Sequence, residues 1–223
     1  MATKGLALSQ GVKSYAQQLG FDAVGITDAS SFPNARAAIY ERITSGFLEG
    51  MPWFTASERV ESACDPKKLL AGARSVISLA VSYYTKEPTP VGRDDAMRGR
   101  VARYAWGDDY HRVIKDKLRL FGEYLLSLGA SREGVRVFVD TGPMVDRAAA
   151  QRSGVGWYGK NTNIIVPGIG SWVFLAQVVT DLELEGDEPL RKSCGTCSLC
   201  IASCPTGAIV APYVVDSTRC ISY

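Results

Sequence analysis

Four cysteines near the end of the chain have the spacing of an iron–sulfur site. Cys194, Cys197, Cys200 and Cys204 are followed directly by Pro205, which gives the run C-x2-C-x2-C-x3-C-P. In bacterial ferredoxins this run holds [4Fe–4S] clusters, with three thiolates on one cluster and the cysteine before proline on a second. Zinc sites usually have two separated C-x-x-C pairs, so the equal spacing favours iron–sulfur. The segment is therefore predicted to transfer electrons.

The cysteine count limits this ligand set. Two such clusters need eight thiolates, at four for each cluster, whereas the chain has six cysteines in all. Cys220 is expected to join Cys204 on the second cluster, and Cys64, far from the run, is expected to be an ordinary buried thiol. We expect the 223 residues to be the front part of a longer protein. The alternatives are that other groups complete the clusters or that the clusters are not built.

Composition sets the broad class of protein. A hydrophobic content of 46% over 223 residues allows one large domain, or one domain plus a small module. The first residues lack the apolar core of a signal peptide, and no apolar run approaches the roughly 18 residues of a membrane span. We therefore expect a cytoplasmic protein without a membrane partner. In that reducing compartment, clustered cysteines indicate metal binding rather than disulfides.

The net charge of +2 is unevenly distributed, because four arginines fall within eleven residues. They are Arg93, Arg98, Arg100 and Arg103. On charge alone a solvated basic loop is the preferred interpretation, and a nucleic-acid contact stays open.

Hydrophobic periodicity predicts a mixture of helices and strands without regular alternation, which is typical of the α+β class. The expected helices cover residues 7–19, 34–47, 109–128 and 145–152. The expected strands cover residues 21–26, 73–84 and 135–139. Residues 163–166 and 171–182 are expected to pair as a hairpin across the turn 167–170. An acidic stretch near Gly186 predicts the border between a domain of residues 1–186 and a cysteine module of residues 187–223.

Two further residues have types that could carry chemistry. Asp140 follows an expected strand directly, where an aspartate usually caps a turn or the next helix but could also serve as a catalytic acid. His111 is the only histidine, which argues against a histidine-rich metal site or a Ser-His-Asp hydrolase; a surface position at the start of a helix is preferred. The glycines between residues 154 and 161 are expected to allow close backbone approach to something flat or bulky.

Several segments, in order along the chain, resemble the epoxyqueuosine reductase family. They are residues 103–111 (RYAWGDDYH), 139–143 (VDTGP), 154–161 (GVGWYGKN), 170–172 (GSW), the cysteine run and 219–223 (RCISY). The resemblance extends from about Met51 to the last residue. It implies an enzyme that uses cobalamin and iron–sulfur clusters to reduce epoxyqueuosine to queuosine in the anticodon loop of tRNA, the last step of that modification.

The resemblance also implies a nitroreductase-like domain that binds cobalamin, followed by the first part of a two-cluster ferredoxin-like module. Asp140 corresponds to the proton donor of the family and also to a cobalamin contact. Arg59, Ala102 and Arg103 correspond to the cobalamin pocket, and Lys160 and Asn161 to a loop beside it. One cluster is then assigned to Cys194, Cys197 and Cys200, and the other to Cys204 and Cys220.

The partners that the resemblance implies are a tRNA with a GUN-type anticodon and an external electron donor of the flavodoxin or ferredoxin-like kind, with the protein a monomer. Because module cysteines are missing, activity is expected to be impaired. The alternatives are an electron-transfer iron–sulfur protein without catalysis, a related corrinoid reductase such as a reductive dehalogenase, and an inactive fragment. The dehalogenases usually carry a twin-arginine signal, which the first nineteen residues lack.

Overall fold

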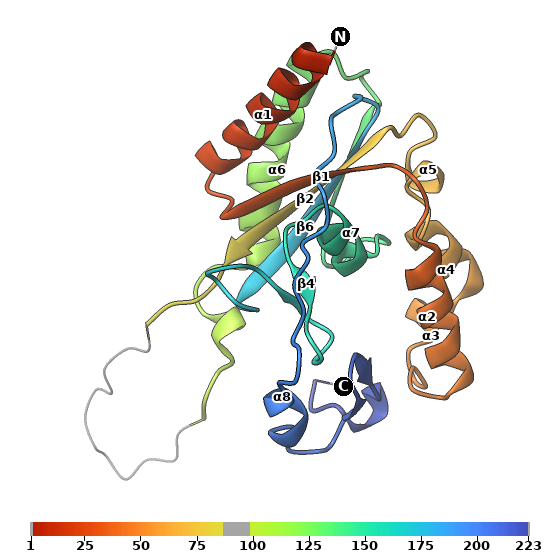
Figure 1. The fold of residues 1–223 in the computed structure, drawn as a ribbon. Coiled ribbons are helices and arrows are strands. Elements are labelled where there is room, and N and C mark those ends of the chain that lie inside the picture. The colour runs from red at the N-terminus through yellow and green to blue at the C-terminus, as the bar shows by residue number, and fades with distance from the viewer. Residues whose placement is uncertain (1, 87–98, 223) are drawn as a thin grey trace.

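A four-stranded antiparallel sheet forms the centre of the computed structural model, which describes residues 2–86 and 99–222 (Figure 1). The strand order is β1-β2-β6-β3. These strands are β1 (Ala23–Asp28), β2 (Ser75–Ser82), β3 (Val135–Val139) and β6 (Val173–Thr180). Residues 75–80 of β2 are all buried, because β2 lies between two strands and helices cover both of its faces. That double burial explains its continuous run of apolar and small side chains.

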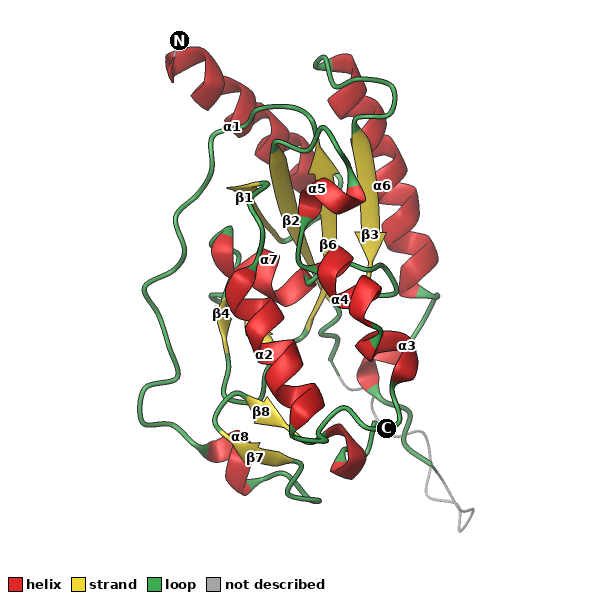
Figure 2. Ribbon diagram, turned by 90° about the vertical axis from the view of Figure 1, so that its right-hand side faces the viewer, coloured by secondary structure: helices red, strands yellow, loops and turns green. Residues whose placement is uncertain are grey.

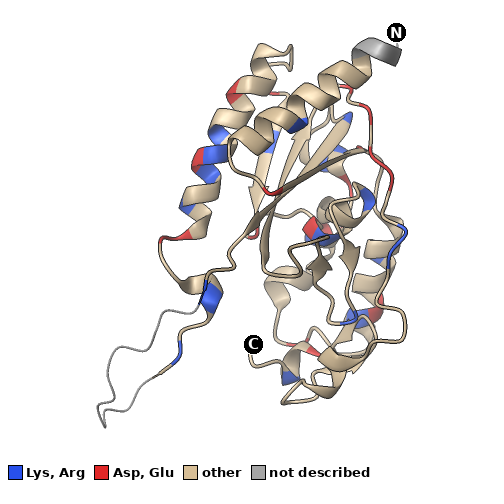
Figure 3. Cartoon of the chain, turned by 60° about the vertical axis from the view of Figure 1, so that its left-hand side comes forward, with Lys and Arg blue, Asp and Glu red and all other residues tan. Residues whose placement is uncertain are grey.

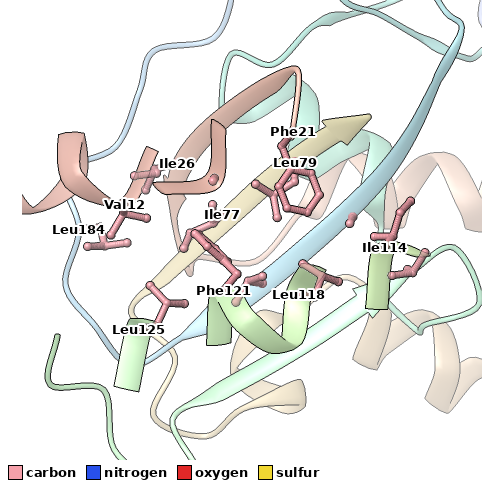
Figure 4. Packing of buried hydrophobic residues seen from close by; sticks show 14 residues of the cluster. Val12, Phe21, Ile26, Ile77, Leu79, Ile114, Leu118, Phe121, Leu125 and Leu184 are labelled. Atoms are coloured by element: carbon pink, nitrogen blue, oxygen red, sulfur yellow. The ribbon is translucent and has the colours of Figure 1, made fainter. Parts of the chain in front are cut away.

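Two long helices, α1 (Ala2–Gln18) and α6 (Tyr110–Ser127), cover one face of the sheet (Figure 1). α6 begins at the N-cap Asp109, whose carboxylate accepts the backbone N–H of His111. Its buried side chains recur at intervals of four, three and four residues and pack against the sheet (Figure 4). They are Ile114, Leu118, Phe121 and Leu125. The opposite side of α6 carries interspersed acidic and basic groups (Figure 3).

The short helix α7 (Asp146–Arg152) packs against the other face of the sheet. Its buried alanines, residues 148–150, allow the helix to lie close to β2 and β6. Gly25 of β1 meets the end of this helix, where an added Cβ would lie 2.1 Å from the carbonyl oxygen of Ser153. This close approach therefore requires glycine at position 25.

Four more helices form a group beside α7 (Figures 1 and 2). They are α2 (Pro33–Thr44), α3 (Pro52–Thr55), α4 (Ser57–Ala63) and α5 (Pro66–Leu69). Phe32, Cys64 and Val76 belong to the buried cluster that joins this group to the sheet and to α7. Within the described ranges no helix is long and apolar enough to cross a membrane.

The cysteine segment contains only short elements and lies at the same end of the molecule as β4 (Figure 2). It comprises α8 (Leu199–Ala202), β7 (Ile209–Ala211), β8 (Val214–Val215) and the 3₁₀ turn η2 (Ser217–Arg219). Hydrogen bonds from Lys160 Nζ to the Gly195 carbonyl and from the Tyr213 N–H to the Lys160 carbonyl join it to the loop after β4.

The expected mixture of helices and strands is confirmed, and each expected helix overlaps an observed one. The hairpin prediction is wrong, because β5 (Ile164–Ile165) pairs with β4 (Trp157–Tyr158), whereas β6 pairs with β2 and β3. Only the bridge between Val166 and Gly170 closes the expected turn. The turn signal was real, but a local signal does not determine which long-range partner each strand takes.

The expectation for the glycine segment is also corrected. An added Cβ at Gly156 would meet Ile164 and the Ile165 carbonyl, and one at Gly154 would meet the Glu188 carbonyl at 2.6 Å. The chain itself therefore fills the space that these two glycines leave. The domain border near Gly186 stays a prediction; the N–H of Asp187 donates to the carbonyl of Ile26 in β1.

Candidate functional site

Asp140 stands in a tight turn at the end of β3. Its φ of 47° lies in the left-handed region, and the N–H of Thr141 donates to the carbonyl of Val139, two residues back, as in a γ-turn. A residue with a side chain rarely adopts this backbone, which costs on the order of 1–3 kcal/mol and often marks a functional position. The carboxylate is exposed, with 59% of the side chain accessible.

The carboxylate of Asp140 borders a cavity of about 170 Å³. The lining comes from the ends of β2, β3, β5 and β6 and the starts of α6 and α7. Its members are Tyr83, Tyr110, Asp140, Asp146, Arg147, Asn163, Ile164, Ser171, Val173, Phe174 and Leu175. These strand ends and helix starts belong to segments far apart in the sequence, so the cavity exists only in the folded chain.

Tyr110 holds one wall of the cavity in place. Its ring stacks on that of Phe174 with centroids 3.9 Å apart and planes 4° apart, and its O–H donates to Oδ2 of Asp140. Burial raises the pKa of Tyr110 well above its usual value, and the Asp140 carboxylate raises it further. Tyr110 therefore stays neutral and keeps the O–H that orients Asp140.

A second carboxyl group, Asp146, lines the same cavity. Burial raises the pKa of Asp146, whereas the charge and the backbone N–H of Arg147 lower it. The nearby carboxylate of Asp140 raises it as well, because two anions in one site oppose each other's ionisation. The cavity thus combines two carboxyl groups with one guanidinium.

The cysteine segment offers thiols on exposed, irregular backbone. All five of its cysteines are free and none is fully buried. The backbone N–H of Ile209, followed by groups of Thr206 and Ala208, lowers the pKa of Cys204 to about 7, so a thiolate is readily available there. Among the described residues, no three metal-ligating side chains are gathered around one point.

Of the residues predicted to bind cobalamin, only Asp140 lines the cavity. Arg59, on α4, lies 6.0 Å from the ring of Trp53. Ala102 is exposed and directly precedes the 3₁₀ turn η1 (Arg103–Ala105). Lys160 donates to the Gly195 carbonyl in the cysteine segment, and Asn161 Oδ1 accepts the N–H of Asn163.

Arg103 lies among three aromatic rings. Its guanidinium carbon is 5.0–5.2 Å from the ring centroids of Tyr84, Trp106 and Trp172, as in cation–π contacts. Arg103 Nε is buried without a hydrogen-bond partner. In the predicted basic loop, Arg93 and Arg98 lie outside the described residues.

Sequence reasoning missed most of the cavity lining. Tyr110 lies in one of the segments that carry the family resemblance, yet spacing does not show which of its side chains face a cavity. Asp146 and Arg147 follow Asp140 by six and seven residues and are adjacent residues of opposite charge. This charged pair was the one feature of the sequence that could have pointed to them as site residues. Nothing in the sequence indicates that Asn163 and Phe174 line a cavity, because this follows only from how the neighbouring strands pair.

Two family models match separate parts of the chain. The model described as "Epoxyqueuosine reductase QueG, DUF1730" matches residues 64–141, and the "4Fe-4S double cluster binding domain" matches residues 193–223. Together with the cavity at the strand ends, these matches define a protein class in which a mixed helix-and-sheet domain is joined to an iron–sulfur module. The match over residues 193–223 confirms the prediction that the cysteine run belongs to an iron–sulfur binding domain.

Similarity extends over nearly the whole chain. An epoxyqueuosine reductase of Leadbetterella byssophila is 43% identical over 215 residues, which are 96% of this chain and 68% of that protein. The epoxyqueuosine reductase structure from Streptococcus thermophilus is 30% identical with a TM-score of 0.89, covering 97% of this chain and 57% of that chain. The chain belongs to the epoxyqueuosine reductase family. It spans little more than half the length of such solved structures.

Other solved structures are informative about the site. An epoxyqueuosine reductase in complex with an epoxyqueuosine-modified tRNA-Tyr stem loop has 35% identity and a TM-score of 0.81. A Bacillus subtilis epoxyqueuosine reductase with its catalytic aspartate loop swung out of the active site has 34% identity and a TM-score of 0.85. A B12-dependent reductive dehalogenase shares the fold at 17% identity and a TM-score of 0.52.

Proposed function

We propose that this chain takes part in reducing epoxyqueuosine to queuosine in tRNA, with Asp140 as the proton donor. The observation that carries the proposal is the carboxyl group of Asp140, exposed at the cavity and oriented by the O–H of Tyr110. The position of Asp140 at a strand end, in a chain of this family, supports the same role.

The reaction needs an acid because an epoxide oxygen is removed. Oxygen that leaves carbon as an alkoxide at neutral pH is a poor leaving group, and a positioned acid can protonate it as charge develops. Such acids typically contribute a factor of about 10²–10⁴ in rate. The cavity has room for a small ring system rather than a whole nucleotide, since drug-sized ligands occupy about 300–1,000 Å³.

Two buried donors without partners support a cobalamin site. Arg103 Nε and Trp157 Nε1 are both buried without a hydrogen-bond partner, and both lie in segments where the family resemblance expects cobalamin. The amide carbonyls around a corrin ring are acceptors for such donors. Arg103 and Trp157, with Arg59, Ala102, Lys160 and Asn161 beside them, would hold the cofactor, which when bound supplies a strongly reducing metal centre. A nitroreductase-like architecture for this domain remains part of the same proposal.

The cysteine module is proposed to deliver the electrons. Cys194, Cys197 and Cys200 would hold one cluster, and Cys204 with Cys220 would supply ligands to another. The Lys160–Gly195 hydrogen bond keeps this segment beside the first domain. An external flavodoxin or ferredoxin-like protein is the proposed donor, and a tRNA with a GUN-type anticodon the proposed substrate.

Asp140→Asn tests the proposal, because it keeps the shape of the side chain and removes the acid. Asp108→Asn is the matched control; Asp108 is an exposed aspartate that pairs with Arg112 at 3.2 Å. Protein reconstituted with iron, sulfide and cobalamin is mixed with an epoxyqueuosine-containing tRNA stem loop and a chemical reductant, and queuosine is measured by mass spectrometry.

We expect Asp140→Asn to lower the rate of queuosine formation about 10²-fold or more and Asp108→Asn to leave it within about twofold. Cobalamin binding is followed separately by absorbance titration of each protein. Saturable binding with unchanged turnover in Asp140→Asn would exclude Asp140 as the acid. Absence of both cobalamin binding and turnover in the unsubstituted protein would overturn the proposed function.

A further inference from the structure

A second carboxyl group of the cavity, that of Asp146, is not needed for the protonation step assigned to Asp140. Asp146 is the first residue of α7 and lines the same cavity as Asp140. Its Oδ1 accepts the backbone N–H of Arg147 at 2.7 Å. Its other carboxyl oxygen, Oδ2, has no hydrogen-bond partner among the described residues. One side of this carboxyl group is therefore available to a molecule in the cavity.

The carboxyl group of Asp146 also lacks an ion-pair partner in the part of the chain that the structure describes. The guanidinium of the adjacent Arg147 donates instead to the Thr162 carbonyl, at 3.4 Å. A buried carboxyl group without such a partner favours its neutral form, because burial penalises the charge. Burial accordingly raises the pKa of Asp146 and the carboxylate of Asp140 raises it further, although Arg147 opposes both. A neutral Asp146 has an O–H that it can donate.

The sheet fixes the position of Asp146. Its backbone carbonyl accepts Nε2 of Gln177 in β6 at 3.4 Å, and Gln177 is buried with 1% of its surface exposed. The alanines that follow in α7, residues 148–150, are buried against β2 and β6. A site residue on a packed element holds a ligand more precisely than one on a loop. Asp146 is therefore better placed than Asp140, which stands in a strained turn, to define where a ligand lies.

The rest of the lining suits a small ring that carries oxygen atoms. Tyr110 and Phe174 contribute stacked aromatic rings, and Asn163 and Ser171 contribute polar side chains. Ligand sites typically combine apolar and aromatic walls with a few polar groups that fix the orientation of the ligand. In this cavity the carboxyl group of Asp146 is such a polar group.

We propose that Asp146 is a substrate-binding residue whose carboxyl group donates a hydrogen bond to an oxygen of the ring that bears the epoxide. The inference rests on the proposed function and divides the work of the cavity. Asp146 recognises and orients the ring, whereas Asp140 protonates the oxygen that leaves. Asp146 forms and breaks no covalent bond, so its proton stays in place. A nucleoside without this ring would leave the buried carboxyl group unpaired, and sites built around a buried polar group discriminate against such ligands.

Two substitutions separate recognition of the substrate from support of the fold. Asp146→Leu keeps a side chain of similar size and removes its hydrogen bonds, whereas Asp146→Asn keeps an N–H that can donate. Asp116→Leu is the matched control, since Asp116 is an exposed aspartate of α6. Protein reconstituted with iron, sulfide and cobalamin is titrated with two fluorescent tRNA stem loops, which carry either epoxyqueuosine or guanosine at the modified position. Fluorescence anisotropy gives the Kd of each stem loop, and circular dichroism compares the folds of the variants.

We expect the unsubstituted protein and Asp116→Leu to prefer the epoxyqueuosine stem loop. Asp146→Leu should lower this preference about tenfold, the size of one hydrogen bond to a buried group, without weakening the binding of the guanosine stem loop. Asp146→Asn should keep the preference within about threefold.

An unchanged preference in Asp146→Leu, or an equal loss of affinity for both stem loops, would overturn the role of Asp146 and leave the proposed function intact. A tenfold loss of preference in Asp146→Asn would contradict donation by the carboxyl group in the same way. No preference in the unsubstituted protein would instead overturn the assignment of this cavity to the modified nucleoside, and with it the proposed function.

Discussion

Individual residues in this chain owe their chemistry to what surrounds them rather than to their type. Two cysteines illustrate the point. Hydrogen bonds, led by the one from the Ile209 N–H, lower the pKa of Cys204 to about 7. Burial, followed by the nearby Glu61 carboxylate, raises the pKa of Cys64 to about 11. The Cys204 thiol is readily ionised, whereas Cys64 is a buried thiol of the core, as the sequence predicted for Cys64.

The raised pKa of Cys64 gives a pH-dependent prediction. In the unfolded chain this thiol ionises near pH 9, whereas in the folded chain it holds its proton until about pH 11. The unfolded state therefore binds fewer protons between these values, and the free energy of unfolding falls as pH rises through that window. Urea unfolding at pH 8, 9, 10 and 11 should show a smaller decrease in Cys64→Ala than in the unsubstituted protein. Parallel decreases would show that folding does not raise the pKa of Cys64.

At the scale of single elements, β1 and the end of α7 come so close that position 25 has no room for a side chain. We expect Gly25→Ala to destabilise the protein by several kcal/mol, because the new Cβ would lie 2.1 Å from the Ser153 carbonyl oxygen and neither backbone can move freely. Gly122→Ala is the matched control. Gly122 lies in the middle of α6, and its new Cβ would meet only the Val135 side chain, at 3.8 Å. We therefore expect this variant to increase the free energy of unfolding by about 0.5–1 kcal/mol.

Urea unfolding followed by circular dichroism measures both glycine variants. A Gly25→Ala protein as stable as the Gly122→Ala protein would contradict the described packing of α7 on β1.

How far the sequence predicts an element depends on whether its cause is local. The buried positions of α6 and the N-cap Asp109 are local features, so the expected helix over residues 109–128 agrees with the observed one within a residue at each end. β6 is different. Its place between β2 and β3 depends on partners about 100 and 40 residues away along the chain, and no turn signal determines that choice.

The candidate site also combines features that the sequence predicts with features that depend on the order of the strands. Asp140 could be singled out from its place after a strand and from family resemblance. The Tyr110–Phe174 stack and the approach of His111 to Asp140 could not, because they join α6 to the ends of β6 and β3. Such contacts follow from the sheet order, which has to be known first.

At the scale of the whole molecule, hydrogen bonds to backbone carbonyls join the cysteine segment to the rest of the chain. Besides the bonds at Lys160, the N–H and the hydroxyl of Ser217 both donate to the Phe47 carbonyl, at 2.9 and 2.7 Å. The segment has short elements and few buried apolar residues. Metal binding is expected to supply part of its stability, as in other small metal-binding modules.

Iron content after reconstitution tests the ligand assignment. We expect Cys200→Ser to lower the iron bound per chain by at least about half, because three thiolates of one cluster lie on the same loop. Cys64→Ser is the control and should bind as much iron as the unsubstituted protein, since Cys64 is buried and lies outside the cysteine segment. Colorimetric iron and sulfide analysis measures both variants. Equal iron in all three proteins would exclude Cys200 as a ligand, and about eight irons per chain would refute the expected shortage of ligands.

The turn at Asp140 has a mechanical consequence. Leaving the left-handed backbone would release about 1–3 kcal/mol, and losing the Tyr110 hydrogen bond to a carboxylate would cost about 1.5–3 kcal/mol. The strain of the turn and the Tyr110 hydrogen bond therefore act on this short loop in opposite directions. A ligand in the cavity that competes with Tyr110 for the Asp140 carboxylate would weaken the contact that holds the strained turn in place.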